Sequence, residues 1–102
     1  MRIYISGPIS GMPDLNREAF AKAAADLRAQ GHEVVNPHEI IDHERAEREG
    51  WEWVDYMRED IKVLMTCEAI CMIEGWGRSR GAKLELHLAR ELGFRVMNWS
   101  AK

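Results

Sequence analysis

Short apolar runs and longer amphipathic stretches alternate along the chain, and this alternation predicts a sheet of strands joined by helices. Apolar and β-branched residues gather into expected strands at residues 2–6, 33–36, 69–73 and 95–97. The run at 69–73, Ala-Ile-Cys-Met-Ile, has no polar residue, as is typical of a strand covered on both faces. Apolar residues with helical spacing predict helices at residues 14–30, 52–66 and 81–92.

The order of these elements predicts the fold class. A β-α-β-α-β-α-β pattern is typical of a three-layer α/β domain of the flavodoxin-like or Rossmann-like type. We expect about four parallel strands in the order 2-1-3-4, with helices on both faces. Asp14 or Asn16 is expected to cap the first helix, and Gly31 to end it. Residues 38–50 are polar without a clear period, which predicts a mobile connection with one helical turn at 45–48.

Composition narrows the range of functions. The 102 residues are expected to form one domain, and the net charge of −3 does not favour a nucleic acid polymer as partner. No apolar run reaches membrane-spanning length, and a first strand at residue 2 leaves no room for a signal peptide. Cys67 and Cys71 are the two cysteines, and we expect both to be reduced in a cytoplasmic protein.

Glu85 is a carboxylate on an apolar helix face. At about 100° per residue, Gly81, Leu88, Ala89 and Leu92 lie within roughly 40° of it. A buried carboxylate is costly and is seldom kept without a partner or a function. The helix follows a loop that contains glycine and serine, so Glu85 is expected to point toward a loop that can hold a ligand.

Asp60 is a second carboxylate on an apolar face, in the preceding expected helix. Its face is shared by aromatic and sulfur-containing side chains, including Trp53, Tyr56 and Met57. Such surroundings raise the pKa of a carboxyl group by desolvation, as a general acid near neutral pH requires. Two carboxylates with separate roles suit cleavage of a glycosidic or N-glycosidic bond. The alternative is structural: Asp60 caps a neighbouring element or pairs with an arginine, and Glu85 binds backbone amides.

Two glycine-containing loops, residues 7–13 and 74–80, are expected to meet where the winding of the sheet reverses. Ser6, Ser10 and the amides of Gly7 and Gly11 can hold a phosphate or sugar hydroxyls there, although a plain tight turn is nearly as good an interpretation. Arg78, Ser79 and Arg80 can contact a phosphate or remain solvated.

Other candidates are weaker. His38 and His43 with Asp42 have a loose metal-like spacing but no third ligand, so we expect no metal and no cofactor. Trp51 and Trp53 can stack on a base or pack in the core. The hydroxyl of Tyr4 is expected to reach Glu85.

With the loop and both carboxylates in place, the chain resembles the nucleoside 2-deoxyribosyltransferase family, which includes the 2′-deoxynucleoside 5′-monophosphate N-hydrolases. The matching pieces are Tyr4-Ile-Ser-Gly-Pro, Asp60-Ile-Lys-Val-Leu-Met-Thr-Cys-Glu-Ala and Ser79-Arg-Gly-Ala-Lys-Leu-Glu-Leu-His-Leu-Ala. In that family an acidic residue or a serine stands six positions before the nucleophilic glutamate. Ser79 and Glu85 keep this spacing.

The resemblance implies that Glu85 attacks C1′ of a deoxynucleoside or deoxynucleotide, that Asp60 assists the departing base and that Tyr4 orients Glu85. The residues expected to bind the substrate are Ser6, Gly7, Pro8, Ser10, Gly11, Trp76, Ser79 and Gly81. Serine at position 79 looks more like the monophosphate hydrolases, whereas Pro8 and Ser10 replace a serine and an arginine that help those enzymes to hold the phosphate.

The chain ends soon after the last expected strand, without the C-terminal segment that completes a neighbouring subunit's base pocket in the transferases. We therefore expect hydrolysis rather than base transfer, in a homodimer or higher homo-oligomer. Two alternatives stay open: a ribonucleotide phosphoribohydrolase, and a nucleotide-binding or sensing module without turnover. A purely structural role explains neither carboxylate.

Overall fold

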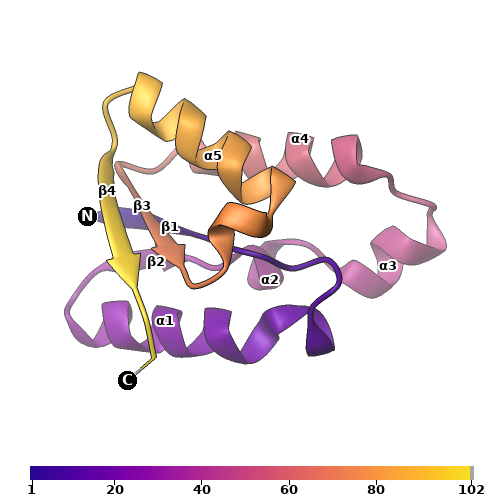
Figure 1. The fold of residues 1–102 in the computed structure, drawn as a ribbon, viewed down its shortest axis with the longest axis horizontal. Helices are drawn as coiled ribbons and strands as arrows, with labels where there is room; N and C mark the ends of the chain where they lie inside the picture. Colours follow the sequence, from indigo (N-terminus) through magenta and orange to yellow (C-terminus); the bar gives the residue numbers. More distant parts are fainter. Residues whose placement is uncertain (102) are drawn as a thin grey trace.

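The computed structural model describes residues 1–101, and these residues contain a four-stranded parallel sheet with helices on both faces (Figure 1). The strands are β1 (Arg2–Ser6), β2 (Glu33–Val35), β3 (Ala69–Ile73) and β4 (Arg95–Trp99), in the order β2-β1-β3-β4. Each neighbouring pair is parallel. The expected flavodoxin-like class and the 2-1-3-4 order are therefore confirmed.

The long helices form the outer layers. Helix α1 (Arg17–Ala29) covers one face of the sheet, and α4 (Trp53–Leu64) with α5 (Arg80–Glu91) covers the other (Figure 1). Four short helices follow strands: η1 (Pro13–Asn16) comes after β1, α2 (Pro37–Ile40) and α3 (His43–Arg48) after β2, and η2 (Trp76–Arg78) after β3. Because parallel strands end at the same edge of a sheet, these short helices gather at its carboxyl edge.

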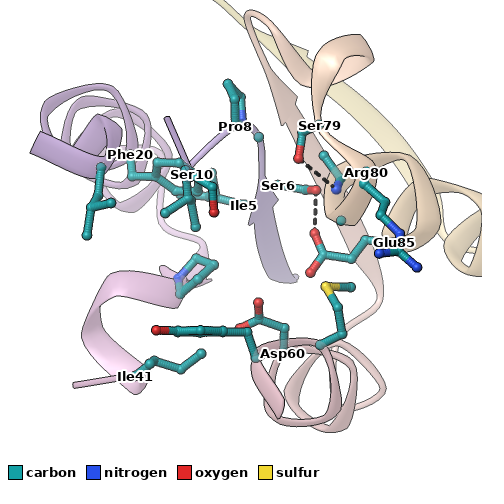
Figure 2. A pocket seen from close by; sticks show the side chains of 18 of the residues that line it. Ile5, Ser6, Pro8, Ser10, Phe20, Ile41, Asp60, Ser79, Arg80 and Glu85 are labelled. Atoms are coloured by element: carbon teal, nitrogen blue, oxygen red, sulfur yellow. Dashed lines mark hydrogen bonds between the residues drawn. The ribbon is translucent and has the colours of Figure 1, made fainter. Parts of the chain in front are cut away.

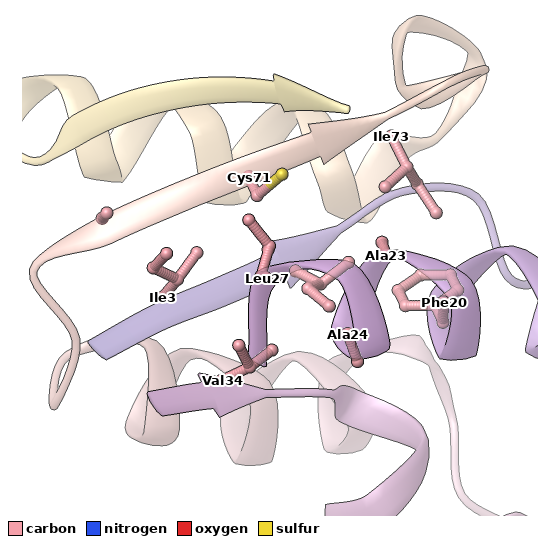
Figure 3. Close-up of a cluster of buried hydrophobic side chains, with 10 residues drawn as sticks. Ile3, Phe20, Ala23, Ala24, Leu27, Val34, Cys71 and Ile73 are labelled. Atoms are coloured by element: carbon pink, nitrogen blue, oxygen red, sulfur yellow. The ribbon is translucent and has the colours of Figure 1, made fainter. Parts of the chain in front are cut away.

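Alternate residues of β1 face opposite layers of the molecule. Ile3 and Ile5 pack with Phe20 in the cluster beneath α1 (Figure 3). Tyr4 packs in a second cluster with leucines of α4 and α5. Since side chains of a strand alternate with a period of two, Ser6 points to the same side as Tyr4. The pattern of β1 thus directs two hydroxyl groups toward α4 and α5.

Strands β3 and β4 differ in burial. All five residues of β3 are buried, as expected for a strand covered on both faces. Strand β4 lies at the edge of the sheet and is mostly exposed or half-buried. It extends two residues further than expected, to Trp99, whose Nε1 donates a hydrogen bond of 2.8 Å to Asp26 of α1.

Most of residues 38–50 lies in the short helices α2 and α3, which is more regular structure than the single expected turn at 45–48, and that turn lies within α3. Side-chain caps start both short helices. Asn36 accepts a hydrogen bond of 3.0 Å from the amide of His38, and Asp42 accepts one of 3.1 Å from the amide of Arg45. Ile41 and Ala46 are buried and hold the segment against the domain.

The start of α1 also differs from the prediction. Asn16 occupies the N-cap position, but its side chain makes no capping bond and donates instead to the carbonyl of Pro8. Asp14 accepts from the side chain of Arg17. Gly31 ends the helix with a φ of +91°, as expected. Leu92 was expected on the buried face of α5 but is 57% exposed, because the helix ends at Glu91.

Candidate active site

A cavity of about 410 Å³ opens at the carboxyl edge of the sheet. Its walls come from the end of β1 and the loop after it, from α2 and α3, from the inner face of α4, and from the start of α5. In Figure 2, Glu85 and Asp60 project into this space from α5 and α4, and Phe20 and Ile41 stand on the side opposite Glu85. The cavity therefore lies where the winding of the sheet reverses, between β1 and β3, as expected.

Glu85 is a buried polar group of the cavity that is held by two hydrogen bonds. Its side chain is 5% exposed, and its two oxygens accept hydrogen bonds from Tyr4 and Ser6. The Tyr4 hydroxyl donates at 2.8 Å and the Ser6 hydroxyl at 2.6 Å. Burial raises the pKa of Glu85 to about 7, against the opposing effect of the two hydroxyl donors. Glu85 is therefore ionised to a substantial extent at neutral pH.

Tyr4 stays a hydrogen-bond donor throughout the physiological range. Burial raises its pKa well above 10, and the negative charges of Glu85 and Asp60 add to this effect. The phenol therefore keeps its proton and can only donate to the carboxylate. This arrangement fixes the orientation of Glu85, as the expected contact between the two residues required.

Asp60 is the second buried carboxyl group in the cavity. It is 7% exposed, and its Oδ1 has no hydrogen-bond partner among residues 1–101. Burial, and to a smaller extent the nearby charge of Glu85, raise its pKa to about 8, against the opposing effect of the Tyr4 hydroxyl. Near neutral pH Glu85 is therefore the more ionised group of the pair and Asp60 the more protonated one. Such a division of protonation states is typical of an acid and a nucleophile that work together.

Small residues bring the walls of the cavity close together. Ser79 caps α5 by accepting a hydrogen bond of 3.1 Å from the amide of Ala82. A Cβ at Gly81 would lie 3.0 Å from the sulfur of Met57, so glycine permits α5 to approach α4. A Cβ at Gly7 would overlap Cγ1 of Ile73. These contacts explain why glycine stands at both positions beside the cavity.

Most of the side chains expected at the site share this cavity, although their roles stay predictions. Those that line it are Tyr4, Ser6, Gly7, Pro8, Ser10, Asp60, Ser79, Gly81 and Glu85. The structure does not place Gly11 and Trp76 in its wall. Trp76 packs against the core cluster and lines a separate hollow next to Trp99. Gly11 has a φ of +80° and serves the turn after β1.

The sequence did not assign the wall opposite Glu85. It is formed by Phe20, Pro37, Ile41, His43 and Tyr56. Several of these residues come from the segment of α2 and α3, in which only one helical turn was expected. Near the mouth, the guanidinium of Arg80 lies 3.6 Å from the centroid of the Trp53 ring. Tyr56 and Asp60 are four residues apart and therefore share one helical face, and this spacing was the available signal that Tyr56 lies near the site.

Other features bear on the remaining predictions. Within residues 1–101, no group of three or more His, Cys, Asp or Glu side chains is arranged to hold a metal ion. Cys67 and Cys71 are buried free thiols. No helix in the described part of the chain has the length and apolar character needed to cross a membrane.

Comparison with known proteins gives the same fold. The chain matches a solved structure of 2-deoxyribosyltransferase from the psychrotolerant bacterium Bacillus psychrosaccharolyticus with a TM-score of 0.70 and 23% sequence identity. The match covers 98% of this chain and 72% of that one. It shows that the two proteins share an α/β architecture.

The family is shown by the sequence itself. Residues 1–98 match the model of a family described as a domain of unknown function, DUF4406. The chain belongs to this family. No curated protein matches the chain well enough to count as a relative.

Proposed function

We propose that this protein cleaves the N-glycosidic bond of a nucleoside or a nucleoside 5′-monophosphate, and that Glu85 is the nucleophile. The observation that carries the proposal is the arrangement of Glu85. A buried carboxylate is held by Tyr4 and Ser6 in a cavity that also contains the protonated Asp60. The shared fold with a 2-deoxyribosyltransferase supports a nucleoside as the substrate class.

The first step forms a glycosyl ester. An oxygen of Glu85 attacks C1′, and the bond between C1′ and the base nitrogen breaks with its electron pair leaving on the base. Asp60 gives its proton to the base, which departs neutral, and Asp60 becomes a carboxylate. Tyr4 and Ser6 keep Glu85 oriented toward C1′. A carboxylate partly desolvated in a cavity is a stronger nucleophile than one in water, because less solvation is lost during the attack.

The second step returns the enzyme to its starting state. Water attacks C1′, Asp60 accepts a proton from that water, and the bond between C1′ and Glu85 breaks to release the carboxylate. The sugar is released with the configuration of the substrate, because two displacements at C1′ invert it twice. Transfer to a second base would replace the water in this step. We propose water as the acceptor, and the assay described below distinguishes it from a second base.

A chromatographic assay for free base tests the proposal. The protein is incubated with common deoxynucleosides, their 5′-monophosphates and the ribo counterparts, with and without an acceptor base. Wild type is expected to release base, and Glu85→Gln to release none while remaining folded. Glu91→Gln is the matched control, because Glu91 lies exposed on the same helix. It is expected to behave as wild type.

The assay also separates the alternatives. Release from ribonucleotides alone would indicate a phosphoribohydrolase. New nucleosides in the presence of an acceptor base would indicate a transferase. If a folded protein releases no base from any compound, the proposal is wrong. A rise in melting temperature with nucleotides in that case would favour a binding module.

A further inference from the structure

Two histidine rings connect the layers on the side of the cavity away from Glu85. The ring centroids of His38 and His43 are 5.0 Å apart. His38 meets the ring of Phe20 from α1 edge-on at 4.9 Å, and His43 is stacked on Tyr56 from α4 at 5.8 Å. The edge of Tyr56 in turn meets Trp51 at 5.3 Å. A row of rings thus fastens α2 and α3 to α1 and α4.

Three nitrogens of these two imidazoles have no hydrogen-bond partner within residues 1–101. They are Nδ1 and Nε2 of His38 and Nε2 of His43, and all three are buried. A neutral imidazole has one N–H and one lone pair, whereas the protonated ring has two N–H groups and a charge. Burying an unpaired charge costs much more than burying an unpaired neutral group. The packed arrangement therefore strongly favours neutral rings.

The charges around the pair act in the same direction. Burial, followed by the charges of His43 and Arg17, lowers the pKa of His38 to about 4. Burial also lowers the pKa of His43, followed by the charge of Arg17. The backbone of Leu15 and the charge of Asp14 favour protonation of His38, and the charge of Asp42 favours protonation of His43, but these effects are weaker.

The other elements packed against the pair bring no compensating anion. From α4, Tyr56 presents its ring to His43, and Glu47 of α3 lines the cavity with an exposed side chain. Glu39 of α2 is paired with Arg28. The described ion pairs include neither histidine. A proton on either ring would therefore meet the cation of Arg17 without forming an ion pair with Asp14 or Asp42, whose opposing effects are weaker.

We propose that His38 and His43 form an acid-sensitive latch, in which protonation of either ring releases residues 37–48 and opens the cavity wall that they form. In the open form the imidazoles reach water and recover an ordinary pKa of about 6.5. The open form therefore gains population as the pH falls below that value. For His38 alone, the ratio of open to closed forms is expected to rise about 20-fold between pH 7 and pH 5.

Amide hydrogen exchange tests the latch without any need for turnover. Exchange rates of peptides covering residues 37–48 are measured between pH 7 and pH 5 and corrected for the intrinsic pH dependence of exchange. In wild type, the protection of this segment is expected to fall about 20-fold, while peptides of β1 and β3 keep theirs. In His38→Leu, the segment is expected to lose most of this pH dependence.

The matched control is His87→Gln, which removes an exposed histidine of α5 and is expected to behave as wild type. Protonation of Glu85 and Asp60 in the same range stabilises the whole fold, which is an effect of opposite sign and is not confined to one segment. Unchanged protection of residues 37–48 in wild type, or an equal change in His38→Leu, would overturn the latch.

A second measurement covers the case in which His38→Leu does not fold. The ring proton resonances of wild-type His38 are followed by NMR as a function of pH. The latch requires a ring that titrates well below 6.5 until the segment opens. A ring that titrates at an ordinary value, with no shift in the amides of residues 37–48, would overturn it. Either result is independent of whether the protein releases base.

Discussion

The hydroxyl of Tyr4 donates a hydrogen bond of 2.8 Å to Oε2 of Glu85, and this bond joins the central strand β1 to α5 across the cavity. Both side chains are buried, so water does not compete for the contact. The strand places the phenol, and the first turns of the helix place the carboxylate. If Glu85 acts as the proposed nucleophile, its placement by two rigid elements reduces the entropy lost on reaching the transition state.

Tyr4→Phe is expected to lower kcat/KM about 10- to 100-fold with little change in fold. A hydrogen bond to a charged group contributes about 1.5–3 kcal/mol, which corresponds to this range of rates. Removal of the donor also removes an influence that lowers the pKa of Glu85. The acid limb of the pH–rate profile is therefore expected to move to higher pH. Steady-state kinetics of base release across pH 5–9 would measure both effects.

Tyr56→Phe provides the control for Tyr4→Phe. It removes a phenol hydroxyl from the same cavity, but that hydroxyl makes no hydrogen bond to Glu85. The acid limb of Tyr56→Phe should coincide with that of wild type. If the two variants shift the limb equally, the hydroxyl of Tyr4 does not act through Glu85.

The pH dependence of kcat/KM is expected to be bell-shaped with its maximum between pH 7 and pH 8. The proposed mechanism requires Glu85 ionised and Asp60 protonated, and their pKa values are about 7 and about 8. Activity therefore falls as the pH drops through the lower value and as it rises through the higher one. Because the two groups interact, the apparent pKa values read from the two limbs belong to the pair and not to either residue alone. Asp60→Asn should abolish the alkaline limb.

Asp60→Asn should also depend on the leaving group. Without a proton donor, substrates with strongly basic leaving groups are expected to slow by about 100- to 10,000-fold, and those with acidic leaving groups much less. Glu59→Gln, one position away on α4, serves as the control. An equal loss for all leaving groups would argue against Asp60 as the acid.

Much of the site could be predicted because β1, α4 and α5 are regular. The period of a strand put Tyr4 and Ser6 on one side, and the period of a helix put Asp60 and Glu85 on buried faces. Parallel strands joined by helices then bring their carboxyl ends together. Local periodicity and the rule for the direction of crossovers were sufficient for these residues.

The wall opposite Glu85 could not be predicted in the same way. Residues 37–48 form two helices of four and six residues, which are too short to show a hydrophobic period. Their formation depends on the caps Asn36 and Asp42 and on packing against α1 and α4. The start of α1 was missed for a related reason, because the left-handed conformation of Asn16 directs its side chain away from the helix.

Glu85→Gln is expected to stabilise the fold at neutral and alkaline pH. The folded-state pKa of Glu85 is about 7, above its ordinary value of 4.5. A carboxyl group with a raised pKa favours folding below its ordinary value and loses this contribution as the pH rises through about 7. Above pH 7 the ionised group therefore costs on the order of 3 kcal/mol, which the neutral amide avoids.

Urea unfolding of wild type and Glu85→Gln at pH 5 and pH 8 would measure this cost. The difference in free energy of unfolding should favour Glu85→Gln at pH 8 and shrink at pH 5. Proteins commonly become more stable when a charged group that is buried unfavourably in an active site is replaced. A difference that does not change with pH would show that Glu85 is not held at a raised pKa.

Gly7→Ala is expected to destabilise the protein by about 1–3 kcal/mol, because its Cβ would overlap Cγ1 of the buried Ile73. Ile73→Ala alone should cost about 2–5 kcal/mol through the cavity it leaves. The double variant is expected to be more stable than the sum of the two losses predicts, since the new methyl group occupies part of that space. Gly77→Ala is the control, as a Cβ there meets no atom within 4 Å. Thermal unfolding of the four variants completes the cycle, and strict additivity would show that Gly7 is not required by its contact with Ile73.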